Sequence, residues 1–150
     1  MLIVGADTPT GSALADVVAG RGEIRMFVSD DTAAGALRSA NFKVALGDVS
    51  DATHVGAAAV GAFSAVLLAE AAVDDRIRSF ASDPSTVVGS WVSAVAEARV
   101  RRVILVAGAE HEELLARAGA GVETAFVHAD GIDAPTLAAR VVALDEARTV

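Results

Sequence analysis

The fold is decided near the start of the chain by the stretch Leu2-Ile3-Val4-Gly5-Ala6-Asp7-Thr8-Pro9-Thr10-Gly11. Its apolar beginning leads into a turn with glycine at both ends, and Leu14, Val17 and Val18 then follow at helical spacing. This order predicts a buried strand, a tight turn and a helix, the first half of a βαβ unit.

The rest of the chain alternates short runs rich in β-branched residues with alanine-rich amphipathic segments. Such alternation is typical of a parallel sheet wound with crossover helices. Further strands are expected at residues 24–28, 42–46, 65–68, 103–106 and 122–127, and further helices at residues 32–40, 53–60, 84–98, 112–118 and 135–147. We therefore expect an α/β fold: a doubly wound parallel sheet, Rossmann-like, of about six strands with helices on both faces.

Length and composition indicate one domain over residues 1–150, since 53% of the 150 residues are hydrophobic and only three are proline. The chain has no cysteine, which excludes disulfides and thiolate chemistry and fits a reducing compartment. The least polar stretch, residues 55–69, contains glycines and a serine and is too short to span a membrane. We expect a soluble, cytoplasmic protein.

The charge balance argues against a nucleic-acid partner. The formal net charge is −8, and Lys43 is the only lysine. Affinity for a phosphate backbone depends largely on clustered Lys and Arg. We therefore expect neither nucleic acid nor membrane as a partner.

Residues 71–82 are the least patterned part of the chain and contain Asp74, Asp75, Arg76 and Arg78. This segment follows the fourth expected strand, so it should lie over the carboxyl edge of the sheet. It is expected to serve as a flexible cover or as a partner contact.

The glycine turn is the natural place for a phosphate, because such a turn directs backbone N–H groups and the positive end of the helix dipole toward the ligand. However, Thr8 stands where a middle glycine would let a pyrophosphate approach the backbone. Its side chain should either cap the helix by bonding to the N–H near Gly11 or project into the phosphate space. Both outcomes compete with a ligand.

Further motifs extend the pattern beyond the turn. They are Gly47-Asp48-Val49-Ser50-Asp51, Gly61-x-Phe63-Ser64-Ala65-Val66 and Arg101-Arg102-Val103-Ile104. Together with the turn, over nearly the whole chain, they resemble, in a divergent form, the atypical short-chain dehydrogenase/reductases, in particular the NmrA-like and flavin-reductase-like NAD(P)H-binding proteins.

The resemblance implies a dinucleotide site at named positions, all of them candidates for cofactor binding. In the family the turn binds pyrophosphate, which points to Gly5, Asp7, Thr8, Thr10 and Gly11, while Ser29 and Asp30 follow the second strand and Asp48 and Val49 match positions that flank the adenine. Relatives that prefer NADP carry an arginine after the second strand, where this chain has carboxylates. The resemblance thus favours NAD(H) over NADP(H), unless the site binds no cofactor.

An alternative role for Asp30 and Asp31 is purely structural. Both residues precede an expected helix, and carboxylates at that position interact favourably with the helix dipole.

The catalytic residues of the family are missing. Its hydride-transferring members use a tyrosine beside a lysine, but this chain has no tyrosine, and Lys43 opens the third strand. Residues 107–109 replace the serine-rich end of the fifth strand. Standard short-chain dehydrogenase chemistry is therefore excluded, and the catalytic residues, if there are any, are unknown.

The three histidines do not predict a metal site. The densest cluster surrounds His111, with glutamates on both sides, but adjacent residues cannot all face one ion, and an acidic helix start explains the pattern. His111 and His128 follow the fifth and sixth strands and are expected near the cleft edge, where His128 could pair with Asp130. His54 is expected on the surface or as a satisfied interior side chain.

These observations favour a non-catalytic role as a dinucleotide sensor or protein-interaction module with a weakened or lost cofactor site. One alternative is a small NAD(P)H-dependent reductase of the flavin-reductase-like type that lacks a tyrosine acid. Another is a structural module that dimerises. The expected partners are therefore a second copy of the chain or another protein.

Overall fold

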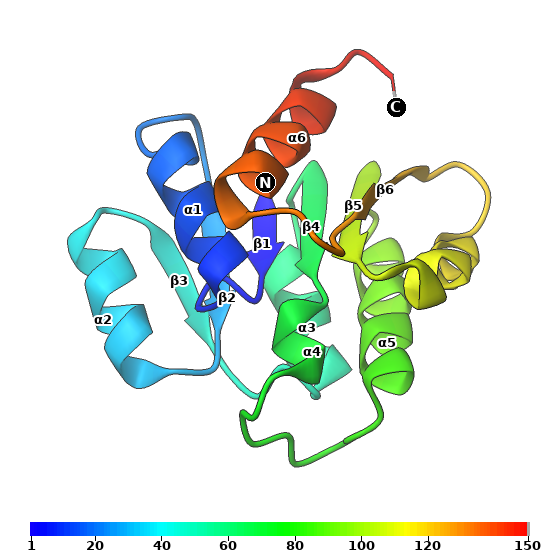
Figure 1. Cartoon of the computed structure of the whole chain (residues 1–150), viewed down its shortest axis with the longest axis horizontal. Coiled ribbons are helices and arrows are strands. Elements are labelled where there is room, and N and C mark those ends of the chain that lie inside the picture. The colour runs from blue at the N-terminus through cyan, green and yellow to red at the C-terminus, as the bar shows by residue number, and fades with distance from the viewer. Residues whose placement is uncertain (150) are drawn as a thin grey trace.

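The computed structural model describes residues 1–149 and contains a six-stranded parallel sheet (Figure 1). The strands are β1 (Leu2–Val4), β2 (Arg25–Val28), β3 (Lys43–Leu46), β4 (Ser64–Leu68), β5 (Arg102–Ala107) and β6 (Glu123–His128). Their order in the sheet is β3-β2-β1-β4-β5-β6. This is the doubly wound order of a Rossmann fold, which confirms the expected fold class.

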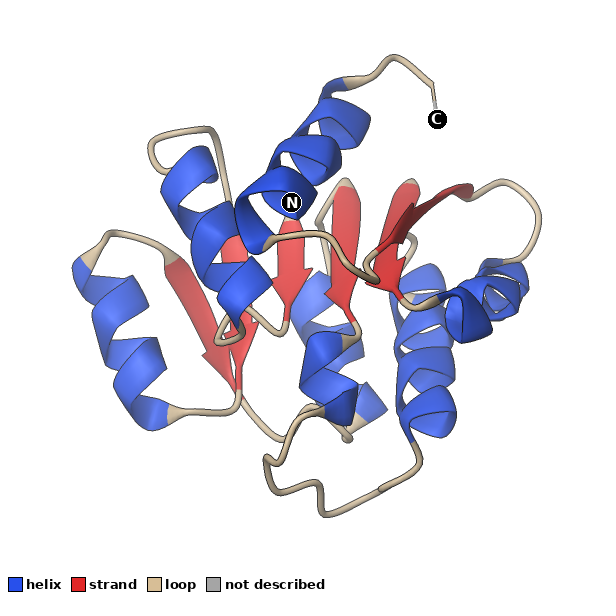
Figure 2. Ribbon diagram, viewed as in Figure 1, coloured by secondary structure: helices blue, strands red, loops and turns tan. Residues whose placement is uncertain are grey.

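Helices cover both faces of the sheet (Figure 2). One face packs against α1 (Pro9–Val18), α2 (Asp31–Ser39) and α6 (Ala134–Glu146), and the other against α3 (Ala52–Ala59), α5 (Pro84–Glu97) and the 3-10 helix η1 (Ala109–Ala118). Leu14 and Val141 belong to the first of these two cores, and Val55 and Trp91 to the second. The central strands β1, β4 and β5 are buried between the two helix layers, so their apolar runs show no alternation.

Two elements differ from the sequence prediction. The short helix α4 (Glu70–Val73) opens the segment expected to be unpatterned, because four residues are too few to show a helical period. The helix expected from residue 112 begins at Ala109 and is a 3-10 helix. The other elements lie within a few residues of their expected positions.

All strands run parallel, so the residues that follow them meet at one edge of the sheet. The strand order reverses between β1 and β4, which pair with Val4 opposite Leu67. In this fold ligands bind outside the carboxyl ends of the strands at that reversal. Figure 1 shows α4 and the loop after it at this edge, with the N-terminus at the opposite end.

No helix in the described part of the chain combines the length and the apolar composition needed to cross a bilayer.

Candidate functional site

The turn after β1 is closed by Thr8. Gly5 has a φ of +83°, which favours glycine, and its carbonyl accepts hydrogen bonds from Thr8 N at 3.0 Å and Thr8 Oγ1 at 2.8 Å. Thr8 Oγ1 in turn accepts from Gly11 N at 3.1 Å. Thr8 is 2% exposed. Of the two outcomes expected for its side chain, the structure shows the helix cap.

Gly11 is required by the close approach of α1 to the turn. A Cβ at this position would lie 2.5 Å from the carbonyl oxygen of Gly5 and 2.6 Å from two backbone atoms of Ala6. Only glycine fits there, independently of any ligand.

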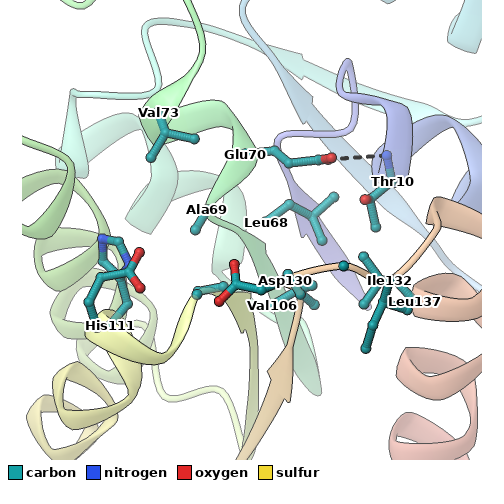
Figure 3. A pocket seen from close by; sticks show the side chains of 15 residues that line it. Thr10, Leu68, Ala69, Glu70, Val73, Val106, His111, Asp130, Ile132 and Leu137 are labelled. Atoms are coloured by element: carbon teal, nitrogen blue, oxygen red, sulfur yellow. Dashed lines mark hydrogen bonds and ion pairs between the residues drawn. The ribbon is translucent and has the colours of Figure 1, made fainter.

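A carboxylate of the chain itself lies at the N-terminus of α1. Glu70, the first residue of α4, accepts a hydrogen bond from Thr10 N through Oε2 at 3.1 Å (Figure 3). The N-terminus of a helix favours anions because its first N–H groups are unpaired and the helix dipole is positive there. Glu70 thus takes a backbone donor that a bound phosphate would use.

Asp7 holds the end of β2. Its Oδ2 accepts hydrogen bonds from Ser29 N at 2.8 Å and Asp30 N at 3.1 Å, and its Oδ1 accepts from Arg76 Nη1 at 2.8 Å. The side chains of Asp7 and Arg76 are 5% and 14% exposed. Arg76 also makes an ion pair with Asp74, which leaves its charge neutralised on two sides.

The arginine is strongly held in its charged form. Burial alone would lower the pKa of Arg76, but hydrogen bonds to Asp74 and Asp7 outweigh it and raise the pKa.

Asp30 caps α2 by accepting from Ala33 N at 2.7 Å. The structural role expected for Asp30 is confirmed, whereas its role toward a ribose stays a prediction.

Residues 74–82, which we call the strap, lie over the loop after β3. Asp48 Oδ2 accepts from Ser79 N at 2.7 Å, and Ser50 Oγ accepts from Phe80 N at 3.0 Å. Val49 is fully buried, and its carbonyl accepts a hydrogen bond from Trp91 Nε1. Residues 71–82 were expected to lie over the carboxyl edge, and the strap does so, held by these hydrogen bonds. Their expected role as a flexible cover or a partner contact stays a prediction.

The Asp48 carboxylate is stabilised as an anion. Burial opposes its ionisation, but hydrogen bonds from the Ser50 hydroxyl and from the backbone of Ser79 and Ser50 prevail and lower its pKa.

As arranged here, these residues do not fit a pyrophosphate. Glu70 takes the Thr10 N–H, Thr8 takes the Gly11 N–H, and Asp7 takes the two N–H groups after β2. A phosphate would have to displace at least one carboxylate of like charge.

A pocket of about 340 Å³ remains beside this closed half, along the carboxyl ends of β4, β5 and β6. It is lined mainly by apolar side chains and by a few polar ones: Thr10, Leu68, Ala69, Glu70, Val73, Val106, Ala107, Gly108, Glu110, His111, Ala129, Asp130, Gly131, Ile132 and Leu137. Figure 3 shows Thr10 and His111 on opposite sides of Leu68 and Ala69. The pocket is the open part of the candidate site.

The histidines fall in three different settings. His111 lines the pocket and is 3% exposed, which confirms its expected place near the cleft edge. His128 Nε2 lies 3.5 Å from Asp130 Oδ2, which confirms the expected pair. His54 is on the surface, 3.5 Å from Asp51. Within residues 1–149, no group of three His, Asp or Glu side chains could hold a metal ion.

Lys43 stands apart from the pocket. It is exposed at the start of β3 and pairs with Glu23.

Sequence reasoning missed Glu70 and the role of Arg76. A signal for Glu70 exists, since it is the second residue after the fully buried strand β4 and so must lie at the carboxyl edge. Arg76 carries no comparable signal, because its contact with Asp7 joins residues 69 positions apart.

No protein-family model matches the sequence, and no curated protein is significantly similar to it. Solved structures do share its fold. ChuY, an anaerobillin reductase from Escherichia coli O157:H7, has a TM-score of 0.69 at 15% identity, over 99% of this chain and 91% of ChuY. An NADPH-dependent quinone oxidoreductase from Escherichia coli, complexed with NADPH, has a TM-score of 0.69 at 17% identity, over 85% of this chain and 47% of the other.

A third similar structure is the triphenylmethane reductase of Citrobacter sp. complexed with NADP(H), with a TM-score of 0.62 at 13% identity, over 85% of this chain and 48% of the reductase. The chain thus spans most of ChuY and about half of the other two proteins. At these identities the likeness is one of fold. It confirms the Rossmann-like fold that the resemblance to atypical short-chain dehydrogenase/reductases implied.

Proposed function

We propose that this chain is a non-catalytic Rossmann-type binding domain whose dinucleotide site is closed by its own side chains. The single observation that carries the proposal is the hydrogen bond from Thr10 N to Glu70 at the N-terminus of α1. With its cofactor site weakened or lost, a domain of this kind acts as a dinucleotide sensor or as a protein-interaction module, because it has no tyrosine to give or take the proton that accompanies hydride transfer.

Three contacts support closure of the whole dinucleotide cleft rather than of one point. Glu70 lies at the pyrophosphate position, Asp7 at the end of β2 and Asp48 under the strap. Each is a carboxylate that accepts a hydrogen bond from a backbone N–H group. Each therefore repels an anionic ligand and also occupies a donor that the ligand could use. The absence of tyrosine from the sequence removes the usual proton donor.

The proposal is tested by calorimetric titration with NAD, NADH, NADP and NADPH. Wild type is expected to bind none of them at micromolar concentration. Glu70→Gln keeps the shape of the side chain and one acceptor oxygen but removes the negative charge. Thr8→Gly opens the turn. We expect Glu70→Gln to gain affinity because the like charge is gone. Micromolar binding by wild type, or turnover of NADH or NADPH with a substrate, would contradict a closed, non-catalytic site.

If a dinucleotide enters, the acidic end of β2 favours NAD(H). Asp30 follows β2, and the nearby Arg76 is already paired with Asp7 and Asp74. The cofactors named for two structural neighbours, NADPH and NADP(H), weigh against this preference. The titration decides it, because all four nucleotides are compared in one buffer.

A second candidate function is a small NAD(P)H-dependent reductase without a tyrosine acid. The observation that favours it is the pocket with buried His111 at the carboxyl ends of β4 to β6, together with the reductases among the structural neighbours. Oxidation of NADPH in the presence of a quinone or a flavin would support it over the binding role.

The exposed apolar side chains of the strap could pack against a protein partner or against a second copy of the chain. Either partner would meet it in the cytoplasm. Ile77 is 85% exposed and Phe80 is 68% exposed. Sedimentation of wild type against an Ile77→Ser variant tests self-association, and a monomer at all concentrations argues against dimerisation.

A further inference from the structure

The pocket at the ends of β4 to β6 holds buried polar atoms without partners. Thr10 is 1% exposed and His111 is 3% exposed, and both line the pocket. Within residues 1–149, Thr10 Oγ1 and both ring nitrogens of His111 have no hydrogen-bond partner. His111 Nδ1 lies 3.0 Å from Glu110 Oε1, an ion-pair distance without the direction of a hydrogen bond. Native proteins rarely leave such atoms unpaired, so the site points to a ligand.

The charges around the pocket are of one sign. Its 15 lining residues include Glu70, Glu110 and Asp130, and none of them is Lys or Arg. In a partly enclosed site such a set of carboxylates attracts a cation and repels an anion. The potential inside the pocket therefore selects against the phosphate ligands usual for the fold.

The remaining wall is apolar. Leu68, Val106, Ile132 and Leu137 line the pocket (Figure 3). With a volume of about 340 Å³, the pocket has room for a compact organic molecule, but it would cover only part of a dinucleotide. An apolar body with a small polar head matches these dimensions.

We propose that this pocket binds a small organic cation, a protonated amine or an amidinium with a compact apolar body. The proposal deepens the proposed function and rests on it, since it names the ligand class that such a binding domain would take. The N–H groups of the ligand donate to Thr10 Oγ1 and to the unprotonated nitrogen of His111. The carboxylates balance the ligand charge, and the apolar wall receives its body.

The test uses three probes of nearly equal size that differ in charge. Benzamidine is a cation, benzamide is neutral and benzoate is an anion. Each is titrated into the wild-type protein by calorimetry and by backbone amide chemical shifts. We expect benzamidine to bind at least about tenfold more tightly than benzamide, with benzoate not binding. The largest amide shifts should fall on residues near Thr10 and His111.

Variants locate the binding. Thr10→Val removes the buried hydroxyl at nearly constant volume. Asp130→Asn removes an exposed carboxylate, so this variant should fold even if the protein does not tolerate the change at the buried Thr10. Each should weaken benzamidine binding several-fold. Asp16→Asn makes the same change of charge on an exposed position of α1 outside the pocket and should leave binding unchanged. Equal affinity for the three probes, preference for benzoate, or indifference to both pocket variants would overturn the proposal.

The same samples are titrated with NADH. Benzamidine binding together with micromolar NADH binding would contradict the closed dinucleotide site while leaving the cation pocket in place. Neither ligand binding would overturn the cation pocket alone. The two proposals therefore fail separately.

Discussion

Glu70 Oε2 lies 3.1 Å from the backbone nitrogen of Thr10, and this hydrogen bond joins residues 60 positions apart. It fastens α4 to the first turn of α1. Asp7 similarly binds the N–H groups of Ser29 and Asp30. In Rossmann-type domains the N-terminus of the first helix offers backbone donors to a phosphate. Here carboxylates of the chain accept from the Thr10 N–H and from the two N–H groups after β2, so these donors are paired without a ligand.

Removal of the Glu70 charge should therefore cost stability. Glu70→Gln loses the interaction of a carboxylate with the positive end of α1, which is worth ~0.3–1 kcal/mol. The free energy of unfolding should fall by that amount in urea, followed by the fluorescence of Trp91, the only tryptophan in the chain. Glu97→Gln is the control, because Glu97 lies at the C-terminal end of α5, where a negative charge is unfavourable. An equal loss in both variants would rule out a dipole effect.

Thr8 is expected to act through its hydroxyl. Thr8→Ala leaves Gly11 N without its buried acceptor and should lower the free energy of unfolding by about 1 kcal/mol. Thr8→Ser keeps the hydroxyl, so it should recover most of the loss. Urea unfolding of the three proteins at one pH provides the measurement. If serine and alanine are equally destabilising, packing of the threonine methyl group matters more than the cap.

The fold was predictable because its signals are local. The apolar run before Gly5 and the helical spacing of Leu14 and Val18 do not depend on distant residues. Burial on both faces gives the central strands β1, β4 and β5 nearly continuous apolar runs. The site was only partly predictable. The helix cap by Thr8 was one of two predicted outcomes, because it involves neighbouring residues. In contrast, Asp7 and Thr10 bind residues that are 69 and 60 positions away. These long-range contacts depend on how α4 and the strap pack against the rest of the fold. The periodicity of the sequence does not predict that packing.

Arg76 should hold the strap in place. Arg76→Met leaves the nearly buried carboxylate of Asp7 without its counter-charge and frees Asp74. We expect a loss of roughly 1–3 kcal/mol in the free energy of unfolding. Amide hydrogen exchange at Ser79 and Phe80 should accelerate more than exchange in β4 and β5. Arg101→Met is the matched control on an exposed position and should change neither quantity. Uniform acceleration over the whole sheet would indicate global destabilisation instead.

The attachment of the strap to Asp48 should weaken in acid. The pKa of Asp48 in the folded protein is below its ordinary value of 3.8, despite burial, because of hydrogen bonds from Ser50 and Ser79. The ionised carboxylate therefore stabilises the folded state above pH 3.8, and this contribution is lost as the pH falls through 3.8 toward the lower folded pKa. Asp48→Asn lacks this group, so its free energy of unfolding should fall less than that of wild type when the pH is lowered from neutral to below 3.8. Identical pH dependence of the two proteins would show that Asp48 does not contribute.

Gly11 should tolerate no side chain, even in the absence of a ligand. In Gly11→Ala the new Cβ would lie 2.5 Å from the carbonyl oxygen of Gly5, a backbone atom that cannot move aside without opening the turn. We expect a loss of more than about 2 kcal/mol in the free energy of unfolding. Gly35→Ala is the control, since Gly35 is exposed within α2 and its Cβ would meet nothing within 4 Å. That change should stabilise the protein by roughly 0.5–1 kcal/mol, because alanine is the better helix former. A mild effect at Gly11 would mean that the turn is looser than the contacts of Thr8 with Gly5 and Gly11 indicate, and that the glycine serves the approach of a ligand rather than packing.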